Sequence, residues 1–186
     1  TNEDILEDIA AMQVLADAVM SDAQGADPEA LTEGDGPHAL AWREWTKPAS
    51  VETNEGGLER LGVLDQLEEA LMETVALDGG SMMIEPTRAL VAIDVNTGRD
   101  TSPAAALKAN LSAAKALPRA LRLRGLGGQI AVDFVSISKA HRKQVEQAMR
   151  AAFKEDPIET SLVGWTTMGL FEMQRKRERL PTRGLL

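Results

Sequence analysis

Apolar residues follow two patterns along the chain. In some segments they recur every three or four residues, which predicts amphipathic helices over residues 4–20, 64–75, 103–121, 138–153 and 170–179. In others they form short runs between turn-forming residues, which predicts strands over residues 81–85, 89–94, 127–135 and 160–165. Two tryptophans, Trp42 and Trp45, lie in a segment of weak pattern, and we expect them to anchor a core.

The order of these elements indicates how a sheet is connected. Pro86 and Thr87 join residues 81–85 tightly to the next strand, which predicts an antiparallel hairpin. The strands that end near Asp94 and Asp133 are separated by a helix of about 20 residues, so a crossover should make them parallel. Pro118 inside that helix is expected to kink or split it. The fold class predicted is α/β, with a mixed sheet and flanking helices.

Each of these two strands carries an aspartate at or near its carboxyl end, Asp94 in one and Asp133 in the other. Ligands of open α/β sheets usually bind at that edge, and two converging carboxylates suit a hard divalent ion such as Mg²⁺. Asn96 follows in a predicted turn and can orient Asp94 or touch a phosphate. The alternative is that both aspartates only cap strand ends or accept hydrogen bonds from turn amides.

Composition narrows the class of protein. The chain has no cysteine, which excludes disulfides and thiolate zinc sites and favours a cytoplasmic location. No apolar run approaches 18 residues, so we expect no membrane span, and no signal peptide is expected either. Because the chain opens on a helical pattern without an initial Met, we expect it to be a piece of a longer protein.

Charge is distributed unevenly. Residues 1–80 contain 19 acidic and 3 basic residues, whereas residues 81–186 contain 10 acidic and 17 basic residues. The second part therefore has the balance expected of a surface that binds nucleic-acid phosphates, although solvated basic faces remain the alternative. His38 and His141 stand alone and are poor metal ligands. Because there is no tyrosine and few other aromatics, base stacking should not dominate any such binding.

Residues 66–179 resemble the catalytic region of the ribonuclease E/G family. The resemblance rests on five segments in the family's order and approximate spacing, Gly79 to Arg99, Leu107 to Ala114, Leu121 to Gly128, Ile130 to Phe134 and Gly169 to Arg177. It implies a deoxyribonuclease I-like catalytic subdomain beside part of a ribonuclease H-like subdomain. We accordingly divide the chain into an acidic, helical or irregular region over residues 1–65 and a catalytic region over residues 66–186.

The resemblance also implies an activity, the Mg²⁺-dependent endonucleolytic cleavage of single-stranded RNA to products with a 5′-phosphate and a 3′-hydroxyl. The two metal-binding aspartates of the family fall on Asp94 and Asp133, and its assisting asparagine falls on Asn96. We predict RNA contacts from five arginines, Arg99, Arg122, Arg124, Arg175 and Arg177.

The chain departs from the family's pattern at several positions. No cysteine follows Arg177, so any homo-oligomer would form without the family's zinc–thiolate link. Gly125 and Ser112 replace acidic residues that are common in the family, and the stretch after Arg99 is less basic than usual. These changes spare the predicted metal ligands but bear on RNA affinity. A non-catalytic RNA-binding or assembly module that retains the fold is therefore the alternative function.

Overall fold

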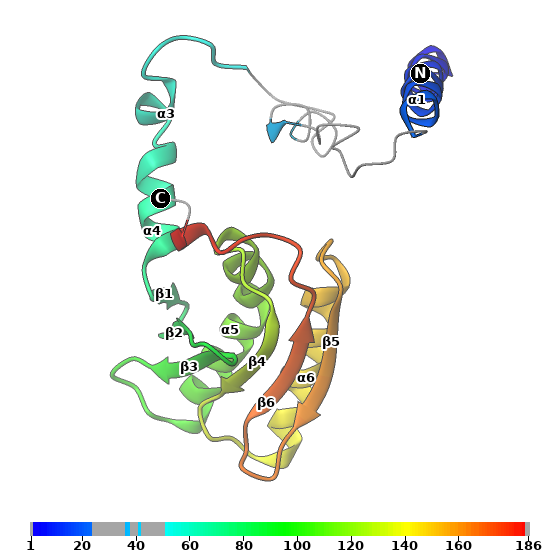
Figure 1. The fold of residues 1–186 in the computed structure, drawn as a ribbon. Helices are drawn as coiled ribbons and strands as arrows, with labels where there is room; N and C mark the ends of the chain where they lie inside the picture. The colour runs from blue at the N-terminus through cyan, green and yellow to red at the C-terminus, as the bar shows by residue number, and fades with distance from the viewer. Residues whose placement is uncertain (1, 24–35, 38–40, 42–50, 185–186) are drawn as a thin grey trace. The chain divides into compact units, whose positions relative to one another are not determined.

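The computed structural model describes residues 2–23, 36–37, 41 and 51–184 (Figure 1). The expectations for Trp42 and Trp45 as core anchors and for His38 as a poor metal ligand fall outside the described residues. The chain divides into two compact units, Thr1–Asn54 and Glu55–Leu186, which are described separately. The boundary expected at residues 65 and 66 falls inside a helix of the second unit, α4 (Val63–Leu71).

The first unit contains α1 (Asn2–Asp22), which extends the helix predicted over residues 4–20 by a few residues at each end. Glu3 and Asp4 lie in its first turn, where the helix dipole favours negative charge. Among the described residues, no helix is both long enough and apolar enough to cross a membrane.

The second unit is built on a six-stranded mixed sheet of order β1-β2-β3-β4-β6-β5 (Figure 1). Its strands are β1 (Thr74–Leu77), β2 (Gly80–Pro86), β3 (Val91–Thr97), β4 (Gly128–Asp133), β5 (Thr160–Trp165) and β6 (Phe171–Arg175). The β2–β3 pair is antiparallel and the β3–β4 pair is parallel, as predicted. The remaining pairs are antiparallel.

Two long helices, α5 (Pro103–Leu123) and α6 (Lys139–Lys154), pack on one face of this sheet (Figure 1). Ser102 and Ser138 cap them, each accepting a hydrogen bond from the backbone amide three residues on. The core lies between these helices and alternate residues of the strands, among them the fully buried Val132 and Leu117. Two short helices, α3 (Gly57–Arg60) and η1 (Thr182–Gly184), complete the described elements of this unit.

Two predicted helices are corrected by the structure. The helix expected over residues 64–75 ends at Leu71, and residues 74–77 instead pair with β2 as β1. The helix expected over residues 170–179 is replaced by β6, in which Phe171, Met173 and Arg175 are buried and alternate with exposed residues. That period of two is a strand pattern, so the expectation of a helix here was wrong.

Pro118 does not split α5, which is one helix through Leu123. Pro118 is itself buried, as are Leu117 and Leu121 beside it. Burial of these side chains offsets the hydrogen bond that a proline nitrogen cannot donate.

Candidate active site

The strand that carries Asp94 is longer than predicted. Asn96 had been placed in a turn, but β3 continues through it to Thr97 because β2 pairs with it over the whole length, ending at Gly80 opposite Thr97. Residues two apart in a strand point to the same face. Asp94 and Asn96 therefore lie side by side, and the Asn96 side-chain amide donates a hydrogen bond of 2.6 Å to Asp94 Oδ2.

Parallel pairing of β3 with β4 places Asp94 directly opposite Asp133. Val95 and Val132, their neighbours in the strands, are buried in the core with α5, whereas Asp94, Asn96 and Asp133 are exposed. Alternation along the strands thus turns both carboxylates to the sheet face that α5 and α6 do not cover. Paired strands lie about 4.8 Å apart, so the two carboxylates are near neighbours.

The donor set of this acidic pair suits a magnesium ion. Mg²⁺ binds through one or two carboxylates and keeps several waters or substrate oxygens. Of the pair's oxygens, Asp94 Oδ2 accepts the bond from Asn96, and within the described residues the Asp133 carboxylate has no hydrogen-bond partner. The same part of the chain holds no group of three or more acidic, His or Cys side chains placed to enclose a metal. The pair therefore fits an ion that also takes ligands from solvent or substrate.

Two of the five predicted RNA contacts are buried in the protein. Arg124 Nη1 and Nη2 donate to the carbonyl oxygens of Ala120 at 3.0 Å and Met72 at 2.9 Å, and burial lowers the pKa of this guanidinium. Arg175 Nη1 donates to Thr160 Oγ1 at 2.8 Å. Both arginines hold secondary-structure elements together, so the structure corrects their expected position on an RNA-facing surface.

Arg122 lies on the helical side of the sheet, away from the acidic pair. It is half-buried and donates through Nη1 to Asp156 Oδ2, while Arg175 Nη2 donates to Asp156 Oδ1 at 2.9 Å. The side chain of Asp156 is fully buried, and both of its ion-pair partners are arginines. This arrangement fixes the Arg122 guanidinium beside the C-terminal end of α6.

The last two predicted contacts are exposed. Arg99 follows β3 on the loop that leads to α5, five residues after Asp94. Beside it, Asp100 accepts a 2.8 Å hydrogen bond from the Ser102 amide, which lowers the pKa of the Asp100 carboxyl and keeps a negative charge next to Arg99. Arg177 lies over Gly128, where a Cβ would come within 2.6 Å of its Nη2. Gly128 begins β4, so Arg177 is at the opposite end of that strand from Asp133.

A residue that sequence reasoning missed is Asn110, which is fully buried in α5. Its amide donates to the Val135 carbonyl at 2.8 Å and accepts from the Val135 amide at 3.0 Å. Val135 lies two residues after Asp133, so Asn110 ties the end of the acidic strand to the helix. A lone amide on the apolar side of a predicted helix was the available signal, because buried polar groups need partners.

A parallel strand–helix–strand unit that brings two aspartates together at the carboxyl ends of its strands defines the class, an α/β protein with a two-carboxylate site. The model of the ribonuclease E/G family matches residues 39–178, and the chain belongs to that family.

Similar proteins carry the names of both branches of the family. The chain is 36% identical over 127 residues to Ribonuclease G of Escherichia coli (strain K12), which covers 63% of this chain and 25% of that protein. It is 38% identical over 124 residues to Ribonuclease G of Haemophilus influenzae, again covering 63% of this chain and 25% of that protein. It is 39% identical over 118 residues to Ribonuclease E of H. influenzae, covering 60% of this chain and 13% of that protein. The chain thus spans a quarter or less of these relatives.

Proposed function

We propose that this chain carries the catalytic site of an endoribonuclease that cleaves single-stranded RNA. The observation that supports the proposal most directly is the register of β3 and β4, which sets Asp94 opposite Asp133 on an exposed face. Names of the relatives agree with it, since they are ribonucleases.

In this proposal Asp94 and Asp133 hold Mg²⁺ and Asn96 keeps the Asp94 carboxylate in place. When bound, such an ion polarises a phosphoryl oxygen and lowers the pKa of a coordinated water. Attack of water on phosphorus with departure of the 3′-oxygen breaks the P–O3′ bond and leaves a 5′-phosphate and a 3′-hydroxyl. The exposure of both carboxylates lets a phosphodiester reach them from the open sheet face.

The proposal also covers the contact with the RNA backbone, the location of the protein and its contacts with other copies. Arg99, on the loop after β3, is the exposed arginine nearest in sequence to the acidic pair, and we assign it to the RNA backbone. The absence of cysteine favours a cytoplasmic protein. Because residues 1–186 contain no cysteine, any homo-oligomer contacts that these residues make would not be zinc–thiolate bonds.

The test is cleavage of an end-labelled, AU-rich single-stranded RNA by the full chain, with Mg²⁺ and with EDTA. We expect cleavage to require the metal, and Asp94→Asn and Asp133→Asn each to lower its rate by about 100-fold or more, since changes to groups that only support a metal ligand already cost about 10- to 100-fold. Asp65→Asn is the matched control, because it removes an exposed aspartate on α4 and should leave the rate unchanged.

Circular dichroism of each variant controls for folding. Sensitivity of the product to a 5′-phosphate-dependent exonuclease checks which P–O bond is broken. Cleavage that persists undiminished in both aspartate variants would contradict the site assigned here. Metal-independent RNA binding without cleavage would instead favour the RNA-binding or assembly module.

A further inference from the structure

Helix α5 has an unusual balance of charge. It contains no acidic residue, and its four basic residues, Lys108, Lys115, Arg119 and Arg122, follow one another at intervals of seven, four and three positions. These intervals place them on one side of the helix. Lys108 pairs with Asp78 at 2.7 Å and Arg122 pairs with Asp156, whereas Lys115 and Arg119 have no ion-pair partner within the described part of the chain.

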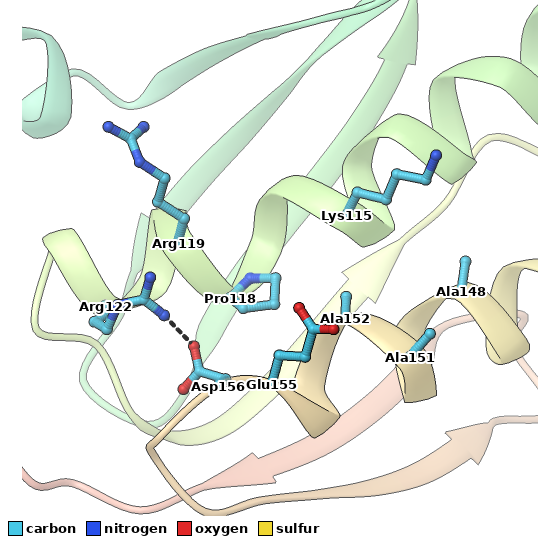
Figure 2. A pocket seen from close by; sticks show the side chains of 9 residues that line it. All are labelled: Lys115, Pro118, Arg119, Arg122, Ala148, Ala151, Ala152, Glu155 and Asp156. Atoms are coloured by element: carbon cyan, nitrogen blue, oxygen red, sulfur yellow. Dashed lines mark hydrogen bonds and ion pairs between the residues drawn. The ribbon is translucent and has the colours of Figure 1, made fainter.

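Lys115, Arg119 and Arg122 line a groove of about 480 Å³ between α5 and α6 (Figure 2). Its α6 side is made of small residues, Ala148, Ala151 and Ala152. Figure 2 shows Lys115 and Arg119 extending away from the helix rather than toward an acidic partner.

The groove keeps a positive balance although two carboxylates border it. The side chain of Asp156 is fully buried and is already bonded to both Arg122 and Arg175. Glu155 is the remaining acidic residue of the lining, which also contains the three basic residues Lys115, Arg119 and Arg122. The groove therefore attracts anions, and Arg122 is held rigidly at one end of it.

This groove is separate from the acidic pair. Residues of β3 that alternate with Asp94, including Ile93 and Val95, are buried against α5. The helices thus cover one sheet face while Asp94 and Asp133 point to the other. A ligand in the groove cannot reach the two aspartates directly, so the groove would act as a second contact.

We propose that the groove between α5 and α6 binds the phosphodiester backbone of single-stranded RNA. Lys115 and Arg122 are seven residues apart, about 10 Å along the helix, which is long enough to contact more than one phosphate. An amphipathic peptide is a poorer match, because alanines offer little pocket for large apolar anchors. No aromatic residue lines the groove, so binding should be independent of sequence and sensitive to salt.

The proposal rests on the proposed function only in taking RNA as the ligand, and its test does not require cleavage. Binding of a 20-nucleotide labelled RNA to the full chain is followed by fluorescence anisotropy in EDTA between 50 and 200 mM KCl. Each contact with a phosphate of a single strand contributes about 0.7 to the slope with which the logarithm of the binding constant falls against the logarithm of the salt concentration. The double variant Lys115→Gln/Arg119→Gln should lower the slope by about 1.4, so that wild-type affinity falls about 7-fold more than the variant's over this range.

The matched control is Lys139→Gln/Lys143→Gln, which removes two exposed charges from α6 outside the groove. Its slope should change less than that of the groove variant. Glu155→Gln should strengthen binding, since it removes the acidic side chain from the lining. Equal effects of both double variants would show a general attraction of RNA to the helical face and would contradict RNA binding in the groove. An unchanged slope in the groove variant would contradict it as well.

Two further arms separate this proposal from others. Polyglutamate that displaces RNA from wild type at the same charge concentration would indicate an acidic protein ligand and contradict the proposal. In cleavage assays, the groove variant should raise KM for a 30-nucleotide RNA and leave kcat/KM for a 6-nucleotide RNA unchanged. If Asp94→Asn abolishes cleavage but the groove variant binds RNA like wild type, the proposal that the groove binds RNA is contradicted and the proposed function is not.

Discussion

At the scale of single residues, the hydrogen bond between Asn96 and Asp94 is the interaction that orients a predicted metal ligand of the candidate site. Asn96 occupies the acceptor Oδ2 with a donor at 2.6 Å and leaves Oδ1 available to a metal ion. A carboxylate that is free to rotate must be ordered before it can hold an ion, and that ordering costs affinity. Asn96 is thus a positioning residue in the proposed mechanism.

Asn96→Ala should accordingly weaken the apparent affinity for Mg²⁺ more than it lowers the cleavage rate at saturating Mg²⁺. We expect the Mg²⁺ concentration for half-maximal cleavage to rise about 10- to 100-fold, with a smaller fall in the rate at saturating metal. Gln129→Ala is a suitable control, since it removes an exposed side-chain amide from the same sheet face. Equal shifts for the two variants would show that Asn96 has no special relation to Asp94.

At the scale of elements, Asp156 joins three parts of the fold. Its carboxylate follows α6 and bonds to Arg122 of α5 and Arg175 of β6. Arg175 is about 1% exposed, so its charge depends on this partner, whereas Arg122 also reaches solvent. The network fixes the helices against the sheet that carries both aspartates.

Asp156→Ala should therefore destabilise the second unit far more than Arg122→Ala. Loss of Asp156 leaves the Arg175 charge buried without a counter-ion, which costs about 3–5 kcal/mol. Loss of Arg122 leaves Asp156 paired with Arg175 and should cost about 1 kcal/mol. Urea unfolding followed by circular dichroism measures both values, and similar costs would mean that Arg175 finds another way to satisfy its charge.

The elements also show which parts of the fold the sequence predicted. Continuous apolar runs and a crossover of helical length were enough to predict that the Asp94 and Asp133 strands are parallel, because both signals are local. The β6 strand was missed because Arg175 is a buried alternating residue, and its burial depends on Asp156, 19 residues earlier. Likewise Arg124 was expected to bind RNA, but its acceptor on Met72 is 52 residues away and no local pattern indicates it.

At the scale of the whole molecule, acidic and basic residues are distributed unevenly along the chain. Residues 1–54 contain 12 acidic and 2 basic residues, so residues 55–186 have a net charge of +1 although the whole chain has −9. The core residues of the second unit lie between Met82 and Met173. Removing residues 1–54 therefore removes none of the core formed by the described residues, and it removes the whole net negative charge.

A chain of residues 55–186 should fold cooperatively and bind RNA more tightly than the full chain at low salt. With its core intact, its Tm should differ by less than about 4 °C, corresponding to about 1 kcal/mol. Its RNA affinity should exceed that of the full chain at 50 mM KCl and converge with it at 300 mM KCl, since salt screens long-range repulsion. Differential scanning calorimetry and anisotropy measure the two properties on the same samples. Weaker RNA binding by the shorter chain at both salt concentrations would instead place RNA contacts within residues 1–54, because loss of repulsion alone cannot lower affinity.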